Sequence, residues 1–301
     1  MAAIQIDHIV KKFGSLRAVD DVSFSVESGE IFGLLGPNGA GKTTTIRIIL
    51  DIFKPDSGQV SILGGAMSEA KKDRIGYLPE ERGLYQDIRL EQALTYLASL
   101  KGLTGADARQ RLDAYLERFD LNQHRKKKVK ELSKGMQQKA QLIVTFAHNP
   151  ELVIIDEPFS GLDPVNTQMV KDLMREQREK GVTIVMCTHQ MNQVEELCDR
   201  LVLINQGKAV LYGRLEEIRH QFAGHEVLVK PVGELPIQIP GVVSRESHNG
   251  TVLLHLSQDV SPQEVLRGLV ESGVGLERFE IAMPTLDQIF IEVVQGEQKV
   301  G

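Results

Sequence analysis

The sequence predicts an α/β protein with a mostly parallel sheet, followed by a small α+β domain. Two nearly continuous apolar runs, at 152–155 and 182–187, are typical of strands in a sheet that is covered on both faces. The stretch between them, 164–180, has a helical pattern, so the three segments predict a strand–helix–strand unit. The pattern of apolar and polar residues changes near residue 220, and we therefore divide the chain into residues 1–220 and 221–301.

The composition is that of a globular protein and excludes several classes of function. The chain has 301 residues and a net charge of -6, so we do not expect the basic surface of a general nucleic-acid-binding protein. Cys187 and Cys198 are the only cysteines, which excludes a disulfide framework and a cysteine-built zinc site and favours a reducing compartment. No apolar run is long enough to predict a membrane-spanning helix.

The first half of the chain predicts a small sheet and then a strand, a turn and a helix. Residues 4–10 and 22–26 alternate or cluster apolar side chains and predict two strands. The apolar run 31–35 ends in a glycine-rich turn, and residues 42–52 predict a helix. From about 68 to 149 the apolar residues recur mostly at helical spacing, so we expect helices there.

The last third of the chain carries turn and capping signals. Residues 201–211 predict a hairpin around an Asn-Gln-Gly turn. Short strands are predicted at 227–229 and 252–256. Ser261 opens a Ser-Pro-Gln-Glu capping box, which predicts the start of a helix, and Thr285 would cap a second helix in the same way. These elements predict the small α+β domain.

A phosphate-binding loop is the strongest functional signal in the sequence. The motif G-x-x-x-x-G-K-[ST] is matched in full by Gly36-Pro37-Asn38-Gly39-Ala40-Gly41-Lys42-Thr43. Glycines let the backbone wrap a polyphosphate, and the N-terminus of the following helix adds partial positive charge. We expect Lys42 to reach the β- and γ-phosphates, the Thr43 hydroxyl to ligate Mg²⁺, and Thr44 to join the nucleotide-binding set. A glycine-rich turn without a ligand is the alternative, but the motif lies between a predicted strand and a predicted helix.

An acidic pair follows the predicted strand at 152–155. Asp156 would end this strand beside the phosphate loop, where a protein ligand of Mg²⁺ belongs. Glu157 is the next residue and would polarise the attacking water. Carboxylates in loops are usually only solvated, but in combination with a phosphate loop the pair predicts a catalytic site.

Further motifs, which appear along the chain in the family's order, resemble those of ABC-type ATPases, the nucleotide-binding units of ATP-binding cassette transporters. The resemblance covers residues 4–215. Residues 132–137, Leu-Ser-Lys-Gly-Met-Gln, resemble the signature LSGGQ, and residues 160–163 resemble the D-loop. His189 occupies the position of the switch histidine, and Phe13 that of the aromatic residue that stacks on adenine. Taken alone, either residue could instead belong to the core.

Two departures from the family pattern bear on the mechanism. Lys134 and Met136 replace a signature glycine and the usual glutamine, whereas Ser133 and Gly135 are retained as candidate nucleotide contacts. Glu80 stands in place of the Q-loop glutamine and, when ionised, accepts hydrogen bonds without donating them. It would still be able to hold Mg²⁺ or its water.

The resemblance implies a P-loop NTPase core with an antiparallel β subdomain and a helical insert at about 80–150. It also implies a head-to-tail dimer, because the signature of one ABC subunit completes the ATP site of another and this chain has one of each. ATP and Mg²⁺ are the implied cofactors. Lys42 would hold the phosphates, Glu157 would orient or deprotonate water, and His189 would steady the γ-phosphate.

The implied partner is a separate integral membrane permease, which the helical insert would touch beside the Glu80 loop. The protein would then lie at the cytoplasmic face of the cell membrane, and no nucleic-acid partner is expected. Residues 76–85 and 284–290 resemble ABC-2-type exporters, including sodium- and drug-export systems, which carry a similar C-terminal extension. Two alternatives stay open: a soluble ABC ATPase that switches a non-membrane partner, and an ATP-gated binding module with little turnover.

Overall fold

The computed structural model of the protein describes residues 2–81, 83–223, 226–248, 250–257 and 259–300. The chain divides into two compact units, Met1–Leu215 and Glu216–Gly301, somewhat ahead of the boundary expected near residue 220. The predicted α/β fold class is confirmed, because a mostly parallel sheet and two antiparallel sheets are present. No helix among the described residues is long and apolar enough to cross a lipid bilayer.

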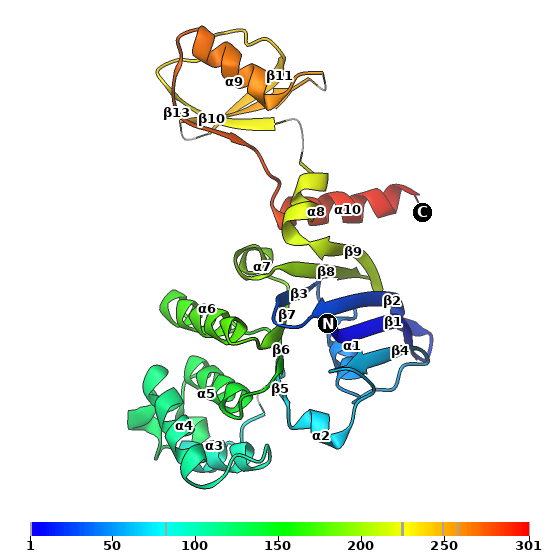
Figure 1. Ribbon diagram of the computed structural model, residues 1–301, viewed down its shortest axis with the longest axis vertical. Coiled ribbons are helices and arrows are strands. Elements are labelled where there is room, and N and C mark those ends of the chain that lie inside the picture. The colour runs from blue at the N-terminus through cyan, green and yellow to red at the C-terminus, as the bar shows by residue number, and fades with distance from the viewer. Residues whose placement is uncertain (1, 82, 224–225, 249, 258, 301) are drawn as a thin grey trace. The chain divides into compact units, whose positions relative to one another are not determined.

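A central sheet with strand order β5-β6-β7-β3-β8-β9 forms the middle of the first unit (Figure 1). Its strands are β3 (Ile31–Leu35), β5 (Ile75–Leu78), β6 (Leu152–Asp156), β7 (Thr183–Thr188), β8 (Arg200–Asn205) and β9 (Lys208–Arg214). The strands from β5 to β8 pair in parallel, whereas β8 and β9 form the predicted antiparallel hairpin. Strands β3, β6 and β7 are buried along their whole length, as their continuous apolar runs require.

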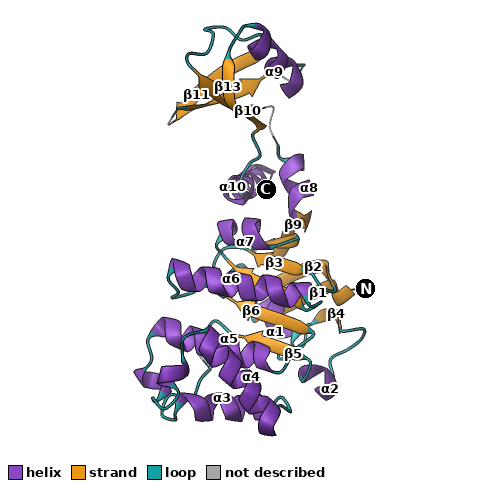
Figure 2. Cartoon of the chain, turned by 60° about the vertical axis from the view of Figure 1, so that its left-hand side comes forward, coloured by secondary structure: helices purple, strands orange, loops and turns teal. Residues whose placement is uncertain are grey.

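A second, antiparallel sheet has the order β2-β1-β4. Its strands are β1 (Ala2–Phe13), β2 (Leu16–Glu27) and β4 (Ser57–Ile62). Helix α1 (Lys42–Ile49) lies between this sheet and the central one (Figures 1 and 2), and Ile46 and Ile49 of α1 belong to one buried cluster with residues of both sheets. This shared core holds the glycine-rich turn before α1 in place.

Most of the remaining helices of the first unit cover the side of the central sheet opposite α1 or form the insert, whereas the short helix α2 (Glu69–Lys72) lies below α1 and β4 (Figure 1). The others are α3 (Leu90–Ser99), α4 (Gly105–Arg118), η1 (Asn122–His124), η2 (Val129–Glu131), α5 (Lys134–Ala147), α6 (Pro164–Glu179) and α7 (Met191–Leu197). Asp163 caps α6, since its Oδ1 accepts a hydrogen bond from the Asn166 N–H at 2.9 Å. Helices α3, α4 and α5 pack together as the helical insert.

One expectation for this region is wrong, because residues 75–78 form the edge strand β5 and not part of a helical stretch. Four residues are too few to show either a helical or a strand period. The strand is set by its tertiary neighbours: it pairs with β6, and a Cβ atom on Gly76 would lie 2.4 Å from the carbonyl oxygen of Thr145 in α5. The glycine therefore allows α5 to approach the strand closely.

The second unit contains an antiparallel sheet with strand order β11-β12-β10-β13. Its elements, with the helix α8 that leads into it, are α8 (Leu215–Gln221), β10 (Glu226–Val232), β11 (Val242–His248), β12 (Thr251–Leu256), α9 (Pro262–Glu271), β13 (Gly275–Ile281) and α10 (Leu286–Val300). Val265 and Leu269 of α9 share a buried cluster with the sheet. The predicted capping box is present, because the side chains of Ser261 and Glu264 each accept the backbone N–H of the other residue.

Candidate functional site

The glycine-rich turn between β3 and α1 is shaped by close backbone contacts that only glycine permits. A Cβ atom on Gly36 would lie 2.1 Å from the carbonyl oxygen of Ile204, and one on Gly41 would lie 2.3 Å from that of Ala18. Gly41 also has a φ of 108°, a conformation that L-residues rarely adopt. The turn is thus held from both sides, which fixes the positions of its N–H groups at the start of α1.

Lys42 and Thr43 open α1 with their side chains at this turn. The Lys42 ammonium is buried and donates to the carbonyl oxygens of Gly36 and Pro37 at 2.7 and 3.0 Å. The Thr43 hydroxyl donates to Asp156 Oδ2 at 3.4 Å. A cation, a hydroxyl and a carboxylate therefore converge beside the helix N-terminus, which is the arrangement that a nucleotide phosphate with a divalent cation requires.

A cavity of about 640 Å³ collects most of the predicted site residues. Its lining comprises Phe13, Leu16, Arg17, Ala18, Asn38, Gly39, Gly41, Lys42, Thr43, Thr44, Glu80, Asp156, Glu157, Gln206 and Gly207. Gly36, Pro37 and Ala40 lie in the same turn, where the Ala40 N–H donates to the Pro37 carbonyl oxygen at 3.2 Å. Two residues of this lining were not predicted: Arg17 at the start of β2 and Gln206 in the turn between β8 and β9. Neither segment carries a nucleotide-binding motif.

Phe13 and Glu80 stand at exposed positions of this cavity. Phe13 is 44% exposed, so it is not a core aromatic residue. Its ring meets Phe53 edge-on at a centroid distance of 5.6 Å, and Lys11 Nζ lies 5.7 Å from the ring centroid. Glu80 is exposed in the loop after β5. Both side chains are thus accessible to a ligand in the cavity.

Glu157 is held by the end of the neighbouring strand β7. Its carboxylate is 8% exposed, with Oε1 2.6 Å from His189 Nδ1 and Oε2 accepting the Thr188 hydroxyl at 3.1 Å. The backbone N–H of His189 also donates to Oε1, at 3.1 Å. His189 itself is exposed, which excludes the alternative of a core histidine. Thr188 is an addition to the predicted site, since no motif singled it out.

The electrostatics around Asp156 favour a bound cation. Burial raises the pKa of Asp156 and the carboxylates of Glu80 and Glu157 raise it further, whereas the hydrogen bond with Cys187 and the charge of Lys42 lower it. Burial likewise raises the pKa of the Cys187 thiol beside it. Oxygen ligands with an excess of negative charge suit Mg²⁺, which binds through one or two protein ligands together with substrate phosphates. The residues present therefore fit Mg²⁺.

The signature residues lie apart from this cavity. Ser133 caps α5, and its hydroxyl accepts the Met136 N–H at 3.2 Å. Ser133 and Gly135 line a second cavity of about 290 Å³ together with Gly161 and Asp163. The two cavities have no lining residue in common, so within one chain Ser133 and Gly135 are not brought to the phosphate loop.

Comparison with known proteins gives matches to both units. A sequence model of the ABC transporter family matches residues 19–160. A second model, for the C-terminal domain of DrrA1-3-like ATP-binding proteins, matches residues 213–294. Together the two matches account for most of the chain.

Individual relatives cover nearly the full length. An uncharacterized ABC transporter ATP-binding protein, YhaQ of Bacillus subtilis, is 42% identical over 97% of this chain and 98% of its own length. The daunorubicin resistance ATP-binding protein DrrA3 of Streptomyces coeruleorubidus is 30% identical over 99% of this chain and 98% of its own. A solved structure of the ATP-binding subunit of an ABC transporter aligns with a TM-score of 0.69 at 34% identity, covering 73% of this chain and 93% of that one.

Proposed function

Because the chain belongs to the family of ABC transporter ATP-binding proteins, we propose that two copies hold ATP and Mg²⁺ between them and drive a separate membrane permease. The chain is the ATPase subunit of a transporter. The observation that carries the proposal is the single cavity that unites the phosphate loop, Asp156 and Glu157. Phosphoryl transfer to water depends mainly on positioning and charge neutralisation, which these groups supply.

In this mechanism each side chain has a stated task. Lys42 and the N–H groups of the glycine-rich turn bind the phosphates, and Phe13 stacks on the adenine. Glu157 orients the attacking water and accepts its proton, while Thr188 and His189 orient the Glu157 carboxylate. His189 is also exposed, and we assign it the task of steadying the γ-phosphate.

The Thr43 hydroxyl and the Asp156 carboxylate would hold Mg²⁺, and Glu80, in the same cavity, would hold the metal or its water. When bound, Mg²⁺ would neutralise charge on the phosphate oxygens. Glu80 and Glu157 place further negative charge beside the buried Asp156, and a bound cation would offset it and favour the ionised carboxylate.

Dimer formation is needed to complete each site. The chain has one phosphate loop and one signature, and these line separate cavities. We therefore assign Ser133 and Gly135 to the ATP that is bound by the partner subunit. ATP would bridge the two subunits, and hydrolysis would remove the bridging phosphate and allow the dimer to open.

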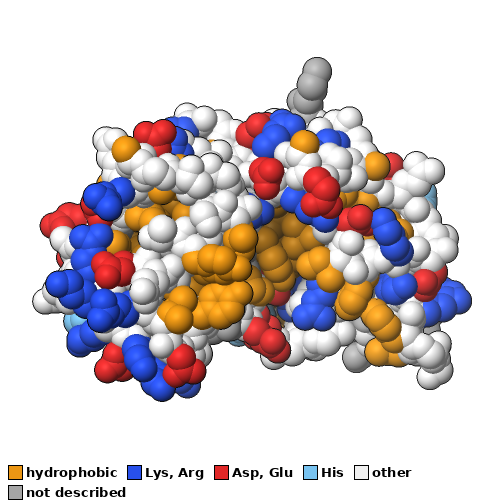
Figure 3. Space-filling model, turned by 90° about the horizontal axis from the view of Figure 1, so that it is seen from below, with side chains coloured by type: hydrophobic (Ala, Val, Ile, Leu, Met, Phe, Trp, Pro, Cys, Tyr) orange, Lys and Arg blue, Asp and Glu red, His pale blue; other side chains and the backbone are white. Residues whose placement is uncertain are grey.

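We assign export as the direction of transport and the helical insert as the surface that meets the permease. The match to a DrrA1-3-like C-terminal domain supports this choice over a soluble switch, as does the similarity to a daunorubicin resistance protein. Hydrophobic side chains gather on the face seen from below in Figure 3, and Tyr85, Tyr96 and Leu100 of the insert are each about half exposed. Such a patch suits a protein partner. The partnership would hold the chain at the cytoplasmic face of the cell membrane.

The substitution Glu157→Gln tests the hydrolytic mechanism. The amide keeps the size of the side chain but cannot accept the proton of water, so we expect ATP binding to persist while turnover falls by about 100-fold or more. Steady-state ATPase assays give the turnover, and size-exclusion chromatography with ATP reveals the trapped dimer.

The same change at an exposed glutamate provides the control, and Glu179→Gln at the end of α6 leaves turnover unchanged. Near-normal hydrolysis by Glu157→Gln would remove Glu157 from the role assigned to it.

A further inference from the structure

The signature helix α5 is tied to the loop between β6 and α6 by a buried glutamine. Gln138 is 4% exposed, and its Nε2 donates to the carbonyl oxygens of Glu157 and Pro158 at 3.4 and 3.3 Å. One amide group with two hydrogen atoms thus serves two successive backbone acceptors. The contact holds the peptide unit that carries the Glu157 side chain.

Two further contacts tie the same loop to α5. A Cβ atom on Gly135 would lie 3.0 Å from the carbonyl oxygen of Gly161, so the signature backbone packs against the middle of the loop. Lys139 Nζ donates to Asn166 Oδ1 at 3.1 Å, just beyond its end. The loop is therefore held to α5 at its beginning, its middle and its end.

The Glu157 backbone needs such support. Its φ of 52° lies in the left-handed region, which is unfavourable for a residue other than glycine and persists only where neighbouring contacts impose it. Its N–H donates to the Cys187 carbonyl oxygen at 2.9 Å, and its own carbonyl oxygen accepts from Ser160 N–H and from Gln138. Of these contacts, Gln138 alone comes from the helical insert.

We infer that Gln138 is a positioning residue, which sets the backbone of Glu157 from the signature helix. The inference rests on the proposed role of Glu157 in orienting water. Ser133, which we assign to the ATP of the partner subunit, caps the N-terminus of α5. The Gln138 contact therefore links the partner's ATP to the Glu157 carboxylate, which acts on the chain's own ATP. A displacement of about 1 Å at a positioned group is enough to lower a reaction rate roughly 100-fold.

The substitution Gln138→Leu in the full-length protein tests the inference. It removes both hydrogen bonds with little change in volume. We expect kcat for MgATP hydrolysis to fall by about 10-fold to 100-fold, while KM for ATP stays within about twofold of the wild-type value. A purely structural role would not separate kcat from KM in this way.

Gln141→Leu is the matched control, because Gln141 lies one turn further along α5, is 6% exposed, and its Oε1 has no hydrogen-bond partner among the described residues. It should leave kcat within about twofold of wild type. A second variant, Gln138→Asn, keeps an amide that is one methylene too short to reach both carbonyl oxygens and should also lower kcat at unchanged KM.

Two results would overturn the inference. One is a wild-type kcat in both Gln138 variants while Glu157→Gln loses turnover, in which case the Gln138 contact alone is refuted. The other is that the Gln138 and Gln141 variants show the same fall in kcat, the same change in KM and the same fall in unfolding temperature. That result would indicate a purely structural role. If Glu157→Gln itself kept turnover, the proposed role of Glu157 would fail and this inference with it.

Discussion

Glu157, Thr188 and His189 show how much a local motif predicts at the scale of single residues. The motif positions identify Glu157 and His189 as site residues, but their contact depends on the parallel pairing of β6 with β7. The same limit explains why Gln138 was missed, since its partner Glu157 lies 19 residues away in sequence and meets it only through packing of α5. Lys42 and Thr43 were predictable because one continuous segment carries the whole phosphate loop.

Phe13 offers a test of nucleotide binding that leaves the fold intact. Because the ring is 44% exposed, Phe13→Ala should change the unfolding temperature little. Loss of stacking on the adenine costs about 1 kcal/mol, so we expect KM for ATP to rise roughly fivefold at an unchanged kcat.

Phe13→Tyr keeps an aromatic face and should retain the wild-type KM. Steady-state ATPase kinetics of both variants provide the measurement. An unchanged KM in Phe13→Ala would argue that the ring does not contact the base.

At the scale of elements, the predictions succeeded where burial is strong or a turn motif marks a hairpin, and they missed four edge strands. The buried strands β3, β6 and β7 have apolar runs that reveal them in the sequence. Strand β4, the edge strand β5 and the strands β11 and β13 were not assigned. Residues 243–247 of β11 are exposed and mostly polar, so neither an apolar run nor a clear alternation marks them. Such strands are stabilised by pairing with a neighbour, which local sequence does not encode.

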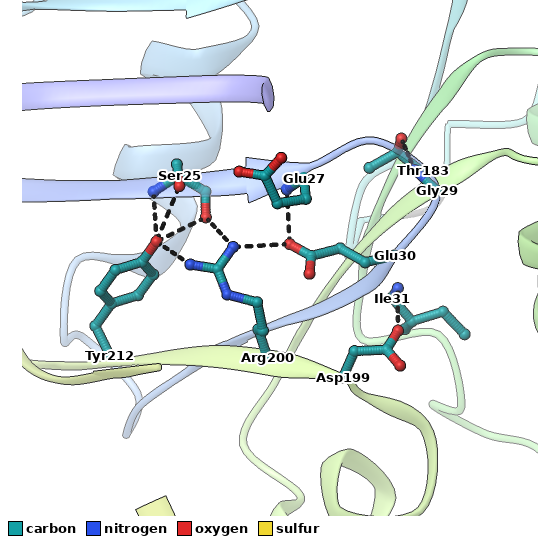
Figure 4. Close-up of polar contacts among 9 residues, drawn as sticks. All are labelled: Ser25, Glu27, Gly29, Glu30, Ile31, Thr183, Asp199, Arg200 and Tyr212. Carbon is teal, nitrogen blue, oxygen red and sulfur yellow. Dashed lines mark hydrogen bonds and ion pairs between the residues drawn. The ribbon is translucent and has the colours of Figure 1, made fainter. Parts of the chain in front are cut away.

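A polar network joins β2, β8 and β9 to Glu30, the residue before β3 (Figure 4). Arg200 of β8 donates to Tyr212 of β9 and to the carbonyl oxygen of Ser25 in β2, and it lies 3.4 Å from Glu30 Oε1. Tyr212 in turn contacts the Ser25 hydroxyl at 3.0 Å. The network thereby connects the antiparallel sheet to the hairpin edge of the central sheet through side chains.

Glu30 makes the stability of this network depend on pH. Burial raises the pKa of Glu30 above its ordinary value, although the Glu27 N–H and Arg200 oppose the change. The folded state therefore binds a proton more tightly than the unfolded state. The stabilisation from Glu30 is full below its ordinary pKa of 4.5 and is lost as the pH rises through the raised value.

The variant Glu30→Gln should remove this dependence, because the amide still accepts the Glu27 N–H but does not titrate. Urea denaturation at several pH values from about 4 to about 7 should show the variant gaining stability relative to wild type as the pH rises. Glu179→Gln serves as the exposed control. A relative loss of stability with rising pH would mean that the Arg200 ion pair dominates.

At the scale of the whole molecule, the sequence predicts the first unit and its chemistry better than the second. The first unit carries motifs whose order identifies a family, whereas the second has a core of its own and its described residues form no catalytic constellation. Both the signature cavity and the nucleotide cavity belong to the first unit, and they are separate within one chain. We therefore propose a symmetric pair of chains, in which each completes the ATP site of the other.

Complementation between two inactive variants tests the paired arrangement. Lys42→Ala removes the phosphate contact of a chain's own site, and Gly135→Asp places a side chain where the signature backbone packs against Gly161 and would meet the partner's ATP. Each variant alone should be inactive. In a mixed dimer one site combines both defects, while the other has an intact Lys42 and an intact signature.

If half of the dimers in an equimolar mixture are mixed, ATPase activity should recover to about a quarter of the wild-type value. If each chain completed its own ATP site, mixing would restore nothing, and the head-to-tail dimer would be refuted.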